Sequence, residues 1–90
     1  MSVRVNIHPI LYPFTNSQDV LEVTGDTVGQ CLEQLVARFP GVKEGLFDKK
    51  GRLLNYVDIY INGESAFPGE LAKPVRDGDE LHIVLIIAGG

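Results

Sequence analysis

The chain has 90 residues, of which 44% are hydrophobic and 22% charged, and its mean hydropathy is +0.08. This composition predicts one soluble domain over residues 1–90, because the apolar fraction is too high for disorder and no apolar run approaches the roughly 20 residues of a membrane span. The net charge of −4 argues against a nucleic-acid partner, and the absence of a signal-peptide pattern at the start predicts a cytoplasmic location.

The first part of the chain predicts a β-hairpin with a long loop. Apolar and polar residues alternate over residues 3–8 and again over residues 20–23, which is typical of strands that bury one face. Prolines and a polar stretch in residues 9–18 interrupt the pattern. The apolar residues 10–14 of this loop are expected to fold back over the sheet edge or to contribute to a contact surface.

A helix follows the hairpin. Thr27-Val28-Gly29-Gln30 matches a capping box, in which the Thr and Gln side chains satisfy free backbone donors. Apolar residues then recur at helical spacing as far as Phe39, and Pro40-Gly41 ends the helix. The apolar stripe consists of Val28, Cys31, Leu32, Leu35, Val36 and Phe39.

The second half alternates between irregular segments and strands. Residues 42–55 predict short irregular pieces. Residues 57–61 form a clear strand pattern, and Asn62-Gly63 is a strong turn signal after it. A brief return strand is expected at residues 66–67, and Asp77-Gly78-Asp79 predicts the turn into the last strand.

The last strand, residues 81–87, is strongly apolar and β-branched, as expected at the centre of a sheet. Its inner residues are expected to be Leu81, Ile83, Leu85 and Ile87. Together the elements predict an α+β fold of the β-grasp (ubiquitin-like) type, with a mixed four- to five-stranded sheet packed on one main helix. A flexible tail, residues 88–90, is expected to complete the single domain.

Few side chains are candidates for metal binding or nucleophilic catalysis. Cys31 is the single cysteine, and with only His8 and His82 beside it the sequence predicts no metal site. On the inner stripe of a helix, Cys31 is expected to pack as a small hydrophobic residue. The carboxylates at Asp77 and Asp79 are explained more simply by turn formation than by calcium binding.

These motifs resemble the MoaD/ThiS family of ubiquitin-like sulfur carriers over essentially the whole chain. The resemblance rests on the hairpin, the helix ending in Arg38-Phe39-Pro40-Gly41, the strand before Asn62-Gly63, and residues 77–83 followed by Ala88-Gly89-Gly90. Within the family, the carriers of cysteine synthesis are most similar, and the small subunit of molybdopterin synthase comes next. Family members commonly have proline at the position of Leu85.

The resemblance implies a carrier protein that is a cosubstrate and not an enzyme. An E1-like adenylating enzyme would use ATP and Mg²⁺ to activate the Gly90 carboxylate, and a sulfur donor would then convert it to a thiocarboxylate. A sulfur-accepting synthase of the cysteine, homocysteine or molybdopterin type would use that sulfur. The bare tail of Ala88, Gly89 and Gly90 suits passage through a narrow channel, because glycine has no side chain.

Two questions stay open at the level of sequence. Val84, Ile86 and Ile87 are the candidate partner-binding residues, since Val84 and Ile86 fall outside the inner register. The alternative is that the loop at residues 10–14, or a twist of the tail, covers them. The tail itself could instead be conjugated to lysines of target proteins, as in a ubiquitin-like modifier. It could also be inert in a non-covalent interaction module.

Overall fold

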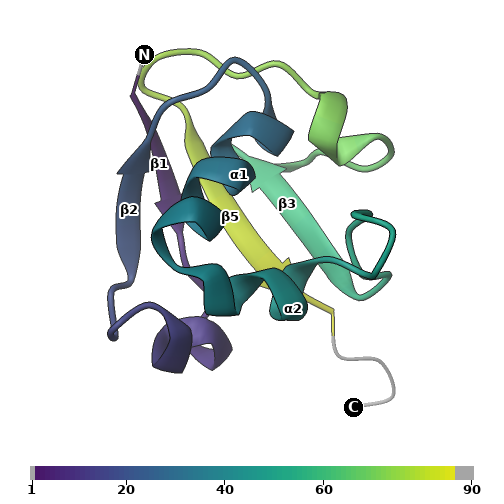
Figure 1. Ribbon diagram of the computed structural model, residues 1–90. Helices are drawn as coiled ribbons and strands as arrows, with labels where there is room; N and C mark the ends of the chain where they lie inside the picture. Colours follow the sequence, from purple (N-terminus) through teal and green to yellow (C-terminus); the bar gives the residue numbers. More distant parts are fainter. Residues whose placement is uncertain (1, 87–90) are drawn as a thin grey trace.

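The computed structural model describes residues 2–86 of the chain. Helix α1 (Val28–Arg38) packs across one face of a five-stranded sheet with strand order β2-β1-β5-β3-β4, which confirms the predicted α+β, β-grasp architecture (Figure 1). The strands are β1 (Val3–Asn6), β2 (Val20–Val23), β3 (Val57–Ile61), β4 (Glu64–Ser65) and β5 (Glu80–Leu85). None of the helices in residues 2–86 is long and apolar enough to cross a membrane.

β5 is the central strand, and its pairing fixes where the chain leaves the sheet. It runs parallel to β1 and antiparallel to β3, with Val5 opposite Leu81 and Ile59 opposite Ile83. These four side chains are almost completely buried. The alternation predicted for the strands is therefore correct, because every second side chain enters the layer between the sheet and α1.

The start of α1 is held by two side chains. Thr27 Oγ1 accepts a hydrogen bond from the Gln30 amide (3.1 Å), and Gln30 Oε1 accepts one from the Asp26 amide (2.7 Å). The predicted reciprocal capping is therefore present, with the Gln30 side chain reaching Asp26. The inner stripe of the helix is buried at Val28, Cys31, Leu32 and Leu35.

The region predicted as irregular contains more structure than the sequence pattern indicates. A 3₁₀ turn, η2 (Pro40–Val42), leads into a short helix, α2 (Lys43–Leu46). Val42 and Leu46 lie one helical turn apart and are both fully buried. Two apolar residues are too few to produce a recognisable period, so tertiary packing decides this helix.

The brief return strand was predicted at residues 66–67, and this prediction is wrong: β4 comprises Glu64–Ser65. Asn62 and Gly63 both adopt positive φ angles, of 51° and 88°, so they form a two-residue turn and pairing resumes at once. Ala66 is buried and donates its amide to the Ile59 carbonyl. Phe67, by contrast, is 71% exposed.

The loop between β1 and β2 forms a 3₁₀ helix, η1 (Pro9–Phe14). Leu11 is buried, and a Cβ placed on Gly45 would lie 2.8 Å from the Leu11 side chain. A Cβ placed on Gly41 would lie 2.9 Å from the Phe14 ring. The loop therefore packs against η2 and α2, where glycine allows close approach.

Candidate functional site

The sheet face opposite α1, called the outer face here, meets the end of β5 at two apolar residues. Val84 pairs with Asp58 of β3 and is half-buried, whereas Ile86 is 53% exposed. The prediction that both residues fall outside the inner register is confirmed by the pairing of β5. The loop at residues 10–14 packs elsewhere, so the alternative that this loop covers Ile86 is wrong; the alternative that a twist of the tail covers it concerns residues outside the described part of the chain.

The backbone holds Ile86 at the end of the central strand. Its amide donates to the Tyr56 carbonyl at 2.7 Å, which extends the pairing of β5 and β3 beyond Leu85. Leu85 itself is half-buried and packs against the core, as expected for an inner residue. The remaining predicted site residues lie outside the described part of the chain; they are Ile87, Ala88, Gly89 and Gly90.

Asp58 is a buried carboxylate on the outer face, and the alternation pattern missed it. It is only 8% exposed and accepts hydrogen bonds from the Ile59 amide and from Ser65 Oγ, both at 2.7 Å. Ser65 Oγ in turn accepts from the Phe67 amide at 3.2 Å. This relay fixes the segment that carries the exposed Phe67 ring. An aspartate inside a β-branched strand is the sequence signal that could have indicated a structural role.

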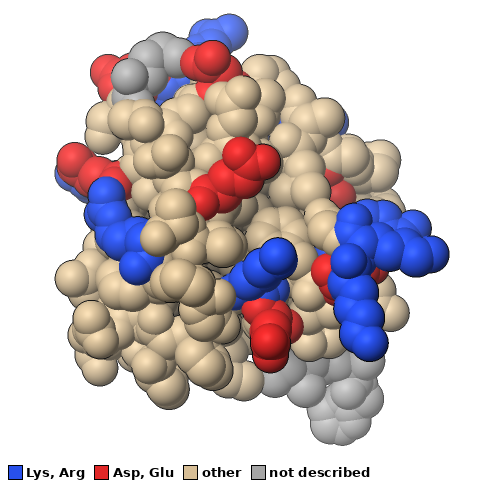
Figure 2. Space-filling view, in the orientation of Figure 1, with Lys and Arg blue, Asp and Glu red and all other residues tan. Residues whose placement is uncertain are grey.

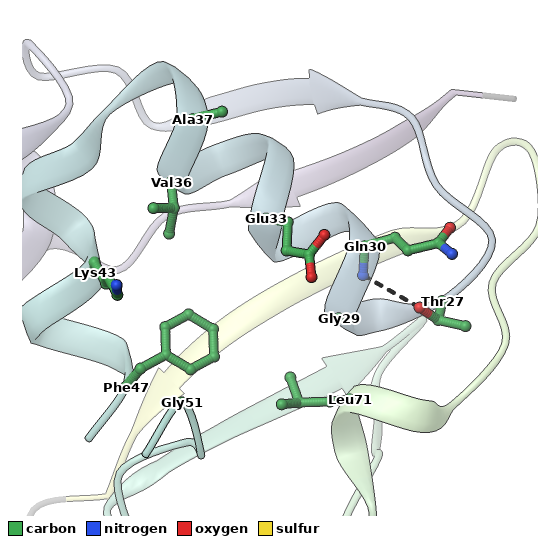
Figure 3. Close-up of a pocket in the computed structure, with 10 residues that line it drawn as sticks. All are labelled: Thr27, Gly29, Gln30, Glu33, Val36, Ala37, Lys43, Phe47, Gly51 and Leu71. Atoms are coloured by element: carbon green, nitrogen blue, oxygen red, sulfur yellow. Dashed lines mark hydrogen bonds between the residues drawn. The ribbon is translucent and has the colours of Figure 1, made fainter. Parts of the chain in front are cut away.

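A groove on the helix side of the molecule is separate from this surface. Its floor is mainly apolar, with Val36 and Phe47 facing each other across it and Leu71 closing one end (Figure 3). Glu33 and Lys43 lie at its rim. None of its lining residues belongs to β5, and it holds no arrangement of nucleophile and base.

Cys31 behaves as a core residue. It is fully buried, and burial, with a smaller contribution from the charge of Asp26, raises the pKa of its thiol. A neutral, inaccessible thiol is a poor nucleophile, so the sequence-based interpretation of Cys31 is confirmed.

The remaining polar candidates have structural roles. His8 Nδ1 accepts from the Ile10 amide at the start of η1. Asp79 accepts from the Arg76 amide within the turn before β5, which confirms the turn interpretation, and Asp77 accepts from the Ser2 amide. Within residues 2–86, no three His, Cys, Asp or Glu side chains gather in a way that could hold a metal ion.

The end of the central strand of this β-grasp fold therefore presents the exposed Ile86 beside the half-buried Val84. Residues 5–90 match the ThiS family. The chain belongs to this family. Over the full length of both chains it is 40% identical to the sulfur carrier protein CysO of Mycobacterium tuberculosis. It is also 35% identical to small archaeal modifier protein 1 of Haloferax volcanii, over 78% of each chain.

Solved structures agree with this assignment. CysO in the Amycolatopsis orientalis BexX/CysO complex superimposes with a TM-score of 0.88 at 34% identity, covering 98% of this chain and 99% of that one. Mycobacterium tuberculosis CysO gives a TM-score of 0.86 at 38% identity, covering 94% and 99%. The ThiS-family chain is therefore a sulfur carrier protein by class and not an enzyme.

Proposed function

We propose that this chain carries sulfur as a thiocarboxylate at Gly90. An adenylating partner enzyme would join a Gly90 carboxylate oxygen to the α-phosphate of ATP, with Mg²⁺ assisting and pyrophosphate leaving. A hydrosulfide-equivalent donor would then attack the carbonyl carbon, forming a C–S bond as the C–O bond to AMP breaks. The sulfur would finally pass to an electrophile held by a sulfur-accepting synthase.

The match to the ThiS family through residue 90 is the observation that carries this proposal. The end of β5 supports it, because Ile86 is anchored to Tyr56 and only three residues separate it from Gly90. A rigid platform next to a slender reactive segment suits a protein whose last residue must enter the site of another enzyme. The 53% exposed Ile86 and the neighbouring Val84 would contact that enzyme, and we propose the same role for Ile87.

The likeness to the mycobacterial carriers favours an acceptor of the cysteine or homocysteine type. The molybdopterin type is the second possibility, and it has weaker support. The Pyrococcus furiosus putative molybdopterin converting factor is only 20% identical, so its TM-score of 0.73 shows the shared fold alone.

The intact mass of the protein isolated from its native host tests the proposal. We expect a species in which one oxygen is replaced by sulfur, located at Gly90 by fragmentation. Deleting Gly90 should abolish this species while leaving the unfolding temperature unchanged, because the deletion removes one terminal residue that has no side chain. An unmodified mass during active sulfur metabolism would contradict the proposal.

A second candidate is a protein modifier attached through Gly90, favoured by the 35% identity to small archaeal modifier protein 1. It shares the activation step but predicts covalent ladders of the chain on other proteins. A non-covalent interaction module predicts instead that deleting Gly90 has no effect. The same mass spectra and a denaturing blot of host extract separate the three outcomes.

A further inference from the structure

A second groove opens on the side of the sheet formed by β3 and β4, and we call it the side groove. One wall is the segment 52–55, the other is the segment 65–72, and Ile86 lies at one margin. The side groove therefore reaches the residue from which the tail departs. Its apolar lining side chains include Leu53, Leu54, Val57, Phe67, Leu71 and Ile86.

Phe67 is the most exposed large apolar residue in the described part of the chain, at 71%. Its backbone is held in place, because its amide donates to Ser65 Oγ, which in turn donates to the buried Asp58 carboxylate. The segment that carries the ring therefore needs little further ordering when a partner binds. Aromatic residues of this kind are the usual energetic centres of protein interfaces.

A basic turn borders the side groove, whose lining also contains the carboxylates of Asp58 and Glu70. Arg52 lines the groove, and Lys49 and Lys50 are exposed in the same turn. Asp48 fixes this turn by accepting from the Lys50 and Arg52 amides at 2.8 and 3.0 Å. The Arg52 side chain is 71% exposed although its Nε lies 3.5 Å from Asp48. Lys and Arg side chains gather at the right-hand edge of Figure 2, where Figure 1 shows the turn beside β3.

We propose that the side groove binds a segment of the adenylating enzyme in which an apolar side chain lies beside a carboxylate. The apolar side chain packs between Phe67 and Ile86, and the carboxylate faces Arg52 and the two lysines. This inference rests on the proposed function, since it specifies how the same partner recognises the carrier.

The position of the side groove favours this occupant over the alternatives. Ile86 lines the groove and lies four positions before Gly90, so a partner that binds Gly90 is brought next to it. Nucleic acid needs a longer basic track and gains nothing from an apolar wall. A protein segment with an apolar side chain beside a carboxylate complements the apolar lining and the basic turn at once.

The experiment uses the full chain and the purified adenylating enzyme from the same organism, with ATP–pyrophosphate exchange measured at several carrier concentrations. Phe67→Ala should raise the KM for the carrier roughly tenfold or more with little change in kcat, as for loss of an aromatic interface residue. Val20→Ala, at a 42% exposed position on the opposite edge strand, is the matched control and should leave KM unchanged.

Lys50→Glu tests the basic turn, and Arg38→Glu, exposed at the end of α1, changes the net charge equally. Of these two variants, only Lys50→Glu should raise the KM for the carrier severalfold at low salt. Its difference in KM from the unaltered chain should shrink at high salt, because exposed charges are screened. Circular dichroism checks that each variant is folded, and Phe67→Leu replaces Phe67→Ala if the latter unfolds, because leucine keeps most of the apolar volume but lacks the ring.

Three results would overturn the inference. Normal KM values for both Phe67→Ala and Lys50→Glu, with normal activation of the unaltered chain, would remove the side groove but leave the proposed function standing. Failure of the enzyme to activate the unaltered chain would reject the proposed function and the inference together. Loss of self-association in the variants, seen by sedimentation, would assign the groove to a contact between copies.

Discussion

The two ends of β5 differ in the contacts that the rest of the chain makes with them. At its beginning, Asp79 accepts from the Asn62 side chain and the Arg76 amide, and Asn62 accepts from the Glu80 amide. At its end, Ile86 makes one backbone bond to Tyr56 and leaves more than half of its side chain accessible. The beginning is completed by polar contacts within the chain, whereas the end presents apolar surface.

This difference separates stability from recognition along a single strand. Hydrogen bonds to turn residues fix where β5 starts and therefore its register with β1 and β3. The proposed contact residues at the other end are only partly covered, so they contribute less to the core and leave apolar surface for a partner. Substitutions at the beginning should therefore change unfolding, and substitutions at the end should change activation.

The largest expected effect is at the end of the strand. Ile86→Asp should raise the KM of the adenylating enzyme for the carrier roughly 10- to 30-fold, because it places a charge in an apolar contact. The unfolding temperature should stay the same, since the position is 53% exposed. Val20→Asp, exposed on edge strand β2, is the control with the same chemical change. Unaltered kinetics for Ile86→Asp would show that the end of β5 is not a contact.

A smaller effect, on stability and not on activation, is expected at the beginning of β5. Asp79→Ala removes two hydrogen bonds and should lower the free energy of unfolding by about 1 to 2 kcal/mol. Urea denaturation measures this loss, with the exposed Asp19→Ala as control. Activation of the folded variant should be normal. A kinetic defect without loss of stability would reverse the assignment of the two ends.

The same carboxylate predicts a modest dependence of stability on pH. The hydrogen bond from the Asn62 side chain, and then that from the Arg76 amide, lower the pKa of Asp79 below its ordinary value of 3.8. The folded state therefore holds the proton less tightly, so this stabilisation is complete above the ordinary pKa and disappears as pH falls through the lower folded pKa.

Asp48, whose pKa is lowered first by its bond from the Arg52 amide, contributes in the same acid window. Urea midpoints measured from neutral pH downward should thus fall in acid. Asp79→Asn should flatten part of that fall and leave the part due to Asp48. An identical pH profile for Asp79→Asn and the unaltered chain would contradict the role given to Asp79.

The smallest expected effect is the energetic coupling between substitutions at the two ends of β5. Positions 79 and 86 are about 23 Å apart at the rise of a strand, so they share no partner. The unfolding free energies of Asp79→Ala and Ile86→Asp should add within about 0.5 kcal/mol in the double variant. A larger coupling, measured by urea denaturation of all four proteins, would show that the two ends act as one unit.

Sequence patterns predicted the elements in which a single period runs long enough to be recognised. The alternation from Val3 to Ile7 and the stripe from Val28 to Leu35 correspond to β1 and α1 with their buried faces correctly assigned. The helix α2 and the position of β4 were missed, because four and two residues are too short to show a period. Val42 and Leu46 form a helical turn only because the core covers both.

The sequence by itself determined the order of the elements, the inner face of each long strand and the presence of apolar residues outside the inner register of β5. These features depend on local periodicity, which the chain carries whatever its partners are. Only the tertiary structure decided that Asp58 is buried, that Phe67 and Ile86 line the same groove, and that a basic turn borders that groove. Each depends on the pairing of β3 with β5, which joins segments far apart in the sequence.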